Sequence, residues 1–171
     1  WGISTVAVHS DVDRESMHVR LADESVCIGP YQPANSYLNI PALMSAIELT
    51  GAEAVHPGYG FLSENSNFAK ILEENNIKFI GPSSKLIKMM GDKIQAKKIA
   101  KENGLPVIEG SDGGIADISD AKKISKKIGF PVLIKAAGGG GGKGMKIVYE
   151  ENKFEELFLA AKSEAKKFFA N

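Results

Sequence analysis

The sequence predicts an α/β protein, with a doubly wound parallel sheet in its first half and a smaller α+β unit in its second. Two observations support this prediction. In the first half, short β-branched runs alternate with segments whose apolar residues recur at helical spacing, which is typical of parallel strands joined through helices. In the second half, two short apolar runs enclose a glycine-rich stretch and precede an amphipathic segment, which favours a hairpin packed on helices.

Size and charge are those of an ordinary globular protein with two parts. The chain has 171 residues and a formal net charge of zero, so neither a nucleic acid nor a membrane surface is expected as a partner. Residues 1–85 contain 5 Lys and Arg against 10 Asp and Glu, whereas residues 86–171 contain 16 against 11. This asymmetry predicts two units, with an anionic ligand nearer the second.

A single cysteine and the lack of a long apolar segment indicate where the protein works. Cys27 has no second cysteine with which to form an internal disulfide, which fits a reducing compartment. No apolar segment reaches the roughly 18 residues of a membrane span, and no signal peptide opens the chain, which begins with Trp1. We therefore expect a cytoplasmic protein, and the missing start methionine suggests a piece of a longer one.

The elements of the first half follow from local signals. Strands are expected where β-branched and apolar residues run together, at Ser4–His9, Ser25–Ile28, Ala54–Val55 and Ile77–Ile80. Helices are expected at Pro41–Leu49, which the stop signal Thr50-Gly51 follows, and at Asn67–Asn75.

The loop His56–Asn65 follows the third of these strands, where doubly wound sheets bind ligands beyond the carboxyl ends of their strands. Its glycines permit a tight path, and it offers an imidazole, a phenol and a carboxylate at His56, Tyr59 and Glu64. Ser63 is a candidate N-cap for the next helix. A rigid turn with a helix cap explains the same residues, so spacing alone leaves both interpretations open.

Helices also open the second half. One is expected at Lys85–Met90, and another runs to Asn103 from Asp92, a good N-cap. Lys93 in the first turn opposes the helix dipole, which is weak evidence that it serves a ligand, although a solvated surface lysine explains it as well. Later helices are expected from Ser119, as N-cap, to Ile128 and at Glu151–Phe169. We divide the chain into domains at 1–81 and 110–171, with a helical connector at 82–109.

The most informative stretch is the glycine-rich one. The apolar run Val132–Ile134 ends in Lys135, six of the next nine residues are glycine, and Met145–Val148 is the second run. Open glycine amides between two strands suit phosphate oxygens, and Lys135 and Lys143 bracket the stretch with positive charge. Because Lys135 ends an apolar strand, we expect its ammonium group to be partly buried and to need an anionic partner.

Two better-known glycine motifs are excluded. A P-loop needs Gly-Lys-Ser/Thr at the start of a helix, but Lys143 is followed by Gly144 and a strand. A dinucleotide fingerprint also opens a helix. A flexible linker is the ordinary interpretation of a glycine run, but a serine-free run between two strands favours a phosphate cradle. The three histidines lack metal-ligand spacing, so no metal site is expected from them.

Three stretches in order resemble the biotin carboxylase family of the ATP-grasp superfamily, and the likeness runs along essentially the whole chain. They are His56–Asn65, Met90–Lys93 and Ile134–Gly144. The resemblance implies a Rossmann-like pre-ATP-grasp domain at 1–81 without its first strand, and an incomplete ATP-grasp lid subdomain at 110–171. Within the family, the sequence resembles a bacterial acetyl-CoA carboxylase subunit, with propionyl-CoA carboxylase and pyruvate carboxylase as relatives.

The resemblance also implies a reaction and its participants. Biotin on a carrier protein would be carboxylated with ATP, bicarbonate and Mg²⁺ through carboxyphosphate. The expected partners are a biotin carboxyl carrier protein or domain and, in the holoenzyme, carboxyltransferase subunits.

Site residues follow from the matching motifs in the same way. Lys93 and Lys135 would bind the ATP phosphates. The lid over the nucleotide would consist of Gly141 and Gly142 with their neighbours Gly138, Gly139, Gly140, Lys143 and Gly144. Four residues of the first domain would border the cleft: His56, Tyr59, Gly60 and Glu64.

Other family features have no counterpart in this sequence. The family's magnesium-binding glutamates, adenine pocket and base normally follow the equivalent of Asn171, so no catalytic or metal-binding residue is assigned here. We expect the 171-residue chain alone to lack carboxylase activity, and Gly138–Gly144 to be poorly ordered without nucleotide. Two alternatives stay open: another ATP-grasp ligase, such as the carbamoyl-phosphate synthetase large subunit, and a non-catalytic nucleotide-binding module.

Overall fold

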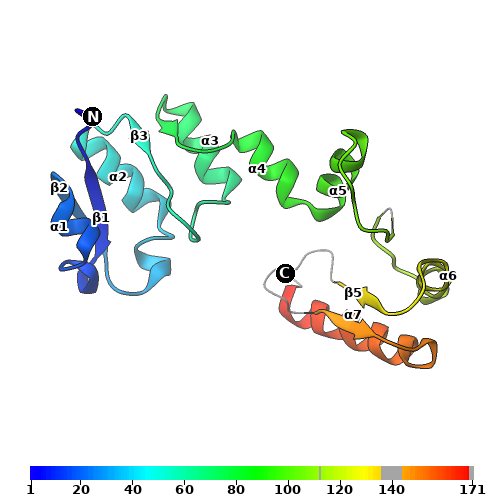
Figure 1. Cartoon of the computed structure of the whole chain (residues 1–171). Helices are drawn as coiled ribbons and strands as arrows, with labels where there is room; N and C mark the ends of the chain where they lie inside the picture. The colour runs from blue at the N-terminus through cyan, green and yellow to red at the C-terminus, as the bar shows by residue number, and fades with distance from the viewer. Residues whose placement is uncertain (112, 136–143, 170–171) are drawn as a thin grey trace. The chain divides into compact units, whose positions relative to one another are not determined.

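The computed structural model describes residues 1–111, 113–135 and 144–169. The chain divides into two compact units, Trp1–Gly91 and Asp92–Asn171 (Figure 1). The helices of the predicted connector fall on both sides of this division, with α4 (Ser84–Gly91) in the first unit and α5 (Lys93–Glu102) in the second. The three-part domain division at 81 and 109 stays a prediction.

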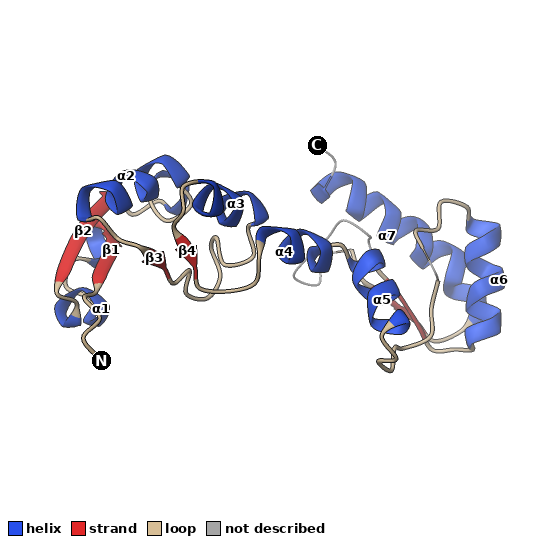
Figure 2. Cartoon of the chain, turned by 90° about the horizontal axis from the view of Figure 1, so that it is seen from above, coloured by secondary structure: helices blue, strands red, loops and turns tan. Residues whose placement is uncertain are grey.

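Parallel strand pairs form the sheets of the first unit. Strand β1 (Val6–Ser10) pairs with β2 (Glu24–Gly29), and β3 (Ala54–Val55) pairs with β4 (Lys78–Phe79) (Figure 2). Helix α1 (Met17–Leu21) connects the first pair, and α3 (Ser66–Glu74) connects the second. The predicted α/β class with parallel strands is confirmed, although no described strand joins the two pairs into one continuous sheet.

The core of the first unit lies under α3. Phe68, Ala69 and Leu72 are almost completely buried there, against Leu62 and Phe79. Partly buried residues of α2 (Ile40–Thr50) also pack on this cluster. Helix α2 has Asn39 as its N-cap and Gly51 as its C-cap, and the positive φ of 65° at Gly51 is the left-handed conformation that glycine supplies at helix ends.

The described residues of the second unit form the predicted hairpin and the helices around it. Strand β5 (Val132–Ile134) pairs antiparallel with β6 (Lys146–Val148). Helices α6 (Ile118–Ile128) and α7 (Phe154–Phe169) pack on it around a core of Ala121, Val148, Phe154 and Phe158. Because the apolar residues of α7 recur at helical spacing, one side of that helix enters the core while Leu159 stays exposed.

Three helix N-caps test the predicted starts. Asp92 caps α5 by accepting hydrogen bonds from the amides of Ile94 and Gln95, as expected. The other two expected caps are wrong. The side-chain amide of Asn65, and not Ser63, caps α3. The carboxylate of Asp117, and not Ser119, caps α6. Both are preferred N-cap residues, because their side-chain oxygens reach the free amides of the first turn.

None of the described helices is both long enough and apolar enough to cross a membrane.

Candidate functional site

The loop after β3 presents its polar residues to solvent. His56, Tyr59, Gly60 and Glu64 are all exposed, and Tyr59 is completely so. This is the carboxyl end of a parallel strand, where sheets of this class position ligand-binding residues. The four predicted cleft-bordering residues therefore lie on one loop of the first unit and are accessible to a ligand.

Short local bonds and one buried side chain shape this loop. The backbone amide of Gly58 donates to Nδ1 of His56 at 3.1 Å, and the amide of Ser63 donates to the Gly60 carbonyl at 2.9 Å. Leu62 is buried in the core of the first unit and anchors the loop from below. The turn encloses a small pocket of about 260 Å³, lined by Tyr59, Gly60, Phe61, Ser63 and Glu64.

A polar network that the sequence did not predict lies beside this loop. The Tyr37 ring stacks on the Phe61 ring, with centroids 5.0 Å apart. Its hydroxyl donates to Oδ2 of Asp13 at 2.5 Å and accepts from the backbone amide of Ser10 at 2.9 Å. The Ser10 hydroxyl donates to the same Asp13 oxygen at 2.6 Å. This network ties the loop to the carboxyl end of β1.

The pKa values of the two ionisable groups in this network move apart. Hydrogen bonds from Ser10 and then Tyr37 hold the pKa of Asp13 below its ordinary value, because they stabilise the carboxylate. Burial, and next the hydrogen bond to Asp13, raise the pKa of Tyr37 above its ordinary value. At neutral pH the network therefore consists of an ionised Asp13 and a neutral phenol that donates to it.

Lys93 and Lys135 both lie in the second unit. Lys93 is the first residue of α5, has no acidic neighbour in that first turn and is exposed. Lys135 directly follows β5 and is also exposed. The predicted partial burial of Lys135 is wrong, because β5 has only three residues and its last one, Ile134, is already only half-buried. Within the described part of the chain, neither ammonium group has an ion pair or a hydrogen bond.

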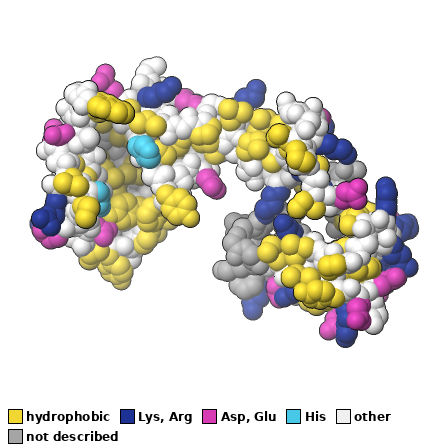
Figure 3. Space-filling model, in the orientation of Figure 1, with side chains coloured by type: hydrophobic (Ala, Val, Ile, Leu, Met, Phe, Trp, Pro, Cys, Tyr) yellow, Lys and Arg dark blue, Asp and Glu magenta, His cyan; other side chains and the backbone are white. Residues whose placement is uncertain are grey.

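Many other lysines of this unit are paired with carboxylates. Lys122 contacts Glu155 at 2.6 Å, Lys126 contacts Glu151 at 2.6 Å, and Lys146 contacts Glu164 at 2.5 Å. Lys and Arg side chains are more frequent over this unit than over the first in the view of Figure 3. Since Lys93 and Lys135 have no such carboxylate among the described residues, their charges are available to an anion.

Most of the predicted glycine lid lies outside the described residues. This holds for Gly138, Gly139, Gly140, Gly141, Gly142 and Lys143, and for the expectation that the stretch is poorly ordered. Gly144 is described. It is buried and has a φ of 70°, which a residue with a side chain rarely adopts, just before β6 begins.

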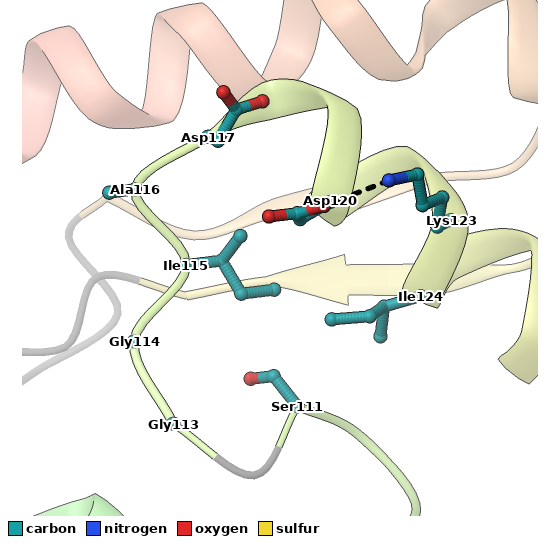
Figure 4. Close-up of a pocket in the computed structure, with 9 residues that line it drawn as sticks. All are labelled: Ser111, Gly113, Gly114, Ile115, Ala116, Asp117, Asp120, Lys123 and Ile124. Atoms are coloured by element: carbon teal, nitrogen blue, oxygen red, sulfur yellow. Dashed lines mark hydrogen bonds and ion pairs between the residues drawn. The ribbon is translucent and has the colours of Figure 1, made fainter.

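A second pocket, also not predicted, has a volume of about 450 Å³ in the second unit. It is lined by the described residues Ser111, Gly113, Gly114, Ile115, Ala116, Asp117, Asp120, Lys123 and Ile124 (Figure 4). The Lys123 ammonium group pairs with Asp120 at 3.1 Å. Hydrogen bonds from the backbone amide and then the hydroxyl of Ser119 lower the pKa of Asp117. With two carboxylates and one paired lysine, this pocket does not suit a phosphate.

Metal ligands are not gathered at either pocket. The described residues contain no group of three or more His, Cys, Asp or Glu side chains that could hold a metal ion. They do not fit a Mg²⁺ site, which needs oxygen ligands in near-octahedral geometry.

Comparisons with protein families divide the chain in a similar way. Residues 1–87 match the model of the biotin carboxylase N-terminal domain. Residues 92–171 match the model of the carbamoyl-phosphate synthase L chain ATP-binding domain.

Whole-chain relatives are carboxylases. The chain is 54% identical to the biotin carboxylase of Haemophilus influenzae and 52% identical to that of Pseudomonas aeruginosa, in each case over 99% of the chain and 38% of the relative. It is 51% identical to the mitochondrial propionyl-CoA carboxylase alpha chain of Rattus norvegicus, over 23% of that protein. The chain thus spans well under half the length of these relatives.

Solved structures of the same kind share the fold. A biotin carboxylase complex with β,γ-ATP from Campylobacter jejuni superimposes with a TM-score of 0.90 at 47% identity, over 99% of this chain and 38% of that one. The biotin carboxylase domain of the Hydrogenobacter thermophilus 2-oxoglutarate carboxylase, in complex with MgADP and bicarbonate, gives a TM-score of 0.86 at 45% identity, over 99% and 37%.

Proposed function

Because the chain belongs to the biotin carboxylase family, we propose that the full-length protein containing it is an ATP-dependent biotin carboxylase. It joins a carboxyl group from bicarbonate to a ureido nitrogen of biotin on a carrier protein. The observation that carries the proposal is the whole-chain identity to biotin carboxylases, with the residues of both predicted ligand-binding regions present.

Lys93 and Lys135 have the chemistry to bind the phosphates of ATP. Both ammonium groups are exposed and without a carboxylate among the described residues. Phosphoryl transfer is accelerated mainly by positioning and by positive charge around the transferring group. Lys93 also lies at the N-terminus of α5, where the helix dipole adds to the positive potential. Gly141, Gly142 and their glycine neighbours would supply open amides as a lid over the same phosphates.

In the proposed reaction a bicarbonate oxygen attacks the γ-phosphorus of ATP, and ADP leaves. The product, carboxyphosphate, breaks into carbon dioxide and phosphate. The ureido nitrogen of biotin then attacks the carbon dioxide, and its proton passes to the released phosphate. Mg²⁺ accompanies ATP and neutralises phosphate charge when bound, and no residue described in this chain is assigned to it.

We assign contacts with biotin to the loop His56–Asn65 of the first unit. His56, Tyr59, Gly60 and Glu64 are accessible, and the tip of the loop offers a phenol ring and glycine amides but no ammonium or guanidinium group. This chemistry suits the uncharged biotin ring better than it suits ATP or bicarbonate.

The partners of the complete protein would be a biotin carboxyl carrier protein or domain and carboxyltransferase subunits. An acetyl-CoA carboxylase of fatty acid biosynthesis is proposed, and the propionyl-CoA carboxylase relatives give the competing acceptor. The free, exposed Cys27 fits a reducing compartment such as the cytoplasm. Carbamoyl-phosphate synthesis is not favoured, since that family matches only residues 92–171.

Replacing either lysine should weaken ATP binding in the full-length protein. A charge-assisted hydrogen bond to an ion contributes about 1.5–3 kcal/mol, so Lys93→Gln and Lys135→Gln should each raise the KM for ATP by about tenfold or more. The assay is phosphate release that depends on both bicarbonate and biotin.

Lys127→Gln is the matched control, because Lys127 is an exposed lysine of the same unit outside the proposed site; its KM for ATP should stay within twofold of the parent value. If neither site variant changes this constant, the assigned phosphate contacts are wrong. If the parent protein releases no bicarbonate-dependent phosphate, the proposed reaction is wrong.

A further inference from the structure

Phe61 has an unusual backbone at the tip of the His56–Asn65 loop. Its φ is 43°, and Asn76 is the other described non-glycine residue with a positive φ. Asparagine tolerates this left-handed conformation, whereas a bulky residue rarely adopts it. Residues held in such conformations persist where the surroundings fix them, and they gather at functional sites. Something must therefore hold Phe61 in place.

The Tyr37 ring is the group that can do so. It stacks on Phe61 with an interplanar angle of 23° and a centroid distance of 5.0 Å. Among the contacts of the described residues, this stack is the single aromatic, ionic or hydrogen-bonding link from Gly58–Phe61 to another segment of the chain. On the other side of Phe61 the buried Leu62 holds the base of the loop, but Tyr59 is fully exposed.

Tyr37 is itself fixed at its hydroxyl. That oxygen donates to Asp13 at 2.5 Å and accepts from the Ser10 amide at 2.9 Å, and the Ser10 hydroxyl donates to Asp13 at 2.6 Å. Ser10 is completely buried at the end of β1. The phenol thus has both a donor and an acceptor satisfied in a defined geometry, and an ionised acceptor makes the bond from its hydroxyl strong. The ring plane offered to Phe61 is set by the sheet.

We propose that Tyr37, held by Asp13 and Ser10, is a positioning residue that fixes the tip of the His56–Asn65 loop through the Phe61 ring. Tyr59 and Gly60 directly precede Phe61 at that tip, so their placement depends on the stack. The inference concerns the same site as the proposed carboxylase function and rests on it for its catalytic consequence. Its structural consequence, an ordered loop tip, does not depend on the reaction.

Tyr37→Leu in the full-length protein removes both the ring and the hydroxyl. Amide hydrogen exchange at Ser63, whose amide donates to the Gly60 carbonyl across Phe61, should accelerate at least tenfold, while exchange at Phe68–Leu72 of α3 changes less than twofold. The kcat/KM for biotin should fall at least tenfold, and the KM for ATP, whose proposed lysines lie in the second unit, should stay within twofold.

Conservative and matched variants complete the design. Tyr37→Phe keeps the stack but loses both hydrogen bonds of the hydroxyl. On a logarithmic scale, its decrease in kcat/KM for biotin should be at most half of that in Tyr37→Leu. Tyr31→Leu makes the same change at an exposed tyrosine of the same segment that has no partner among the described residues, and it should leave all these quantities unchanged. Because Tyr37→Leu and Phe61→Leu break one contact, their effects on exchange should be less than additive when combined.

Two results would overturn the positioning role. One is exchange at the Ser63 amide in Tyr37→Leu that equals that in Tyr31→Leu. The other is an equal acceleration in the loop and in α3, which would mean that Tyr37 only stabilises the whole unit. If the parent protein proves not to carboxylate biotin, the exchange measurements still decide whether Tyr37 holds the loop.

Discussion

Replacing Phe154 by alanine should lower the free energy of unfolding of the second unit by about 3–5 kcal/mol, which is the usual cost of truncating a core phenylalanine to alanine. Phe154 is 3% exposed. Its ring stacks on that of Phe158 with centroids 5.9 Å apart and meets that of Phe130 edge to face with centroids 6.4 Å apart. Truncation removes both ring contacts and leaves a void beside Val148, which is completely buried.

Amide hydrogen exchange at Val148 and Phe158 measures this loss within the second unit alone. Leu159→Ala is the matched control, since Leu159 lies on the same helix and is 53% exposed; its cost should stay below about 1 kcal/mol. Equal protection of Val148 in both variants would show that the aromatic cluster does not support the hairpin.

The same substitution should reach the proposed phosphate site. Val132 and Ile134 of β5 pack against the Phe154 cluster, and Lys135 directly follows them. When the packing that supports β5 weakens, the backbone of Lys135 is held less firmly, so its ammonium group is positioned less well for a phosphate. We therefore expect a higher KM for ATP in the full-length Phe154→Ala protein even though Phe154 is buried away from solvent.

Local order was predictable where the chain carries its own signals. Helix α2 ends with Gly51 as its C-cap, and α5 begins after its N-cap Asp92, both as expected. The β5–β6 hairpin was also predicted, because two short apolar runs flank the glycines. Where two capping residues stood two positions apart, as with Ser63 and Asn65, the sequence offered no way to choose between them.

Features that depend on packing were not predictable. The division of the parallel strands into two pairs is set by tertiary contacts, to which strand propensity is blind. The exposure of Lys135 depends on how far β5 extends from the core. Its apolar neighbours in the sequence therefore led to a wrong prediction of partial burial. The Tyr37 network was missed because Asp13 lies 24 residues away, and only the fold brings the phenol to the end of β1.

Replacing Phe68 by alanine should have a comparable effect in the first unit, with a loss of about 3–5 kcal/mol in its free energy of unfolding. Phe68 is 2% exposed and meets Phe79 edge to face, with centroids 6.4 Å apart. It belongs to the buried cluster that also contains Leu62, Ala69 and Leu72. The void would therefore lie between α3 and β4, the two elements that define this core.

Exchange at Leu72 and at Ile80, whose amide donates to the Val55 carbonyl at 2.9 Å, reports this loss. Leu49→Ala on α2 is the matched control, because Leu49 is 81% exposed and its truncation should change the free energy by no more than about 0.5 kcal/mol. A loss below 1 kcal/mol for Phe68→Ala would mean that the helix and strand close over the site and that the cluster is not the stabilising centre of the unit.

Phe68→Ala and Tyr37→Leu should differ in where they act on the His56–Asn65 loop. Phe68 packs with Leu62, the buried end of the loop, so its loss should accelerate exchange in α3, in β4 and in the loop together. Tyr37 touches the loop through Phe61 alone among the described ring contacts, so its loss should act on the tip while α3 stays protected. Faster exchange should therefore spread from the core in Phe68→Ala and be confined to the loop tip in Tyr37→Leu. This difference would separate support of the loop from control of its position. Only Tyr37→Leu should change kcat/KM for biotin at temperatures where both variants remain folded.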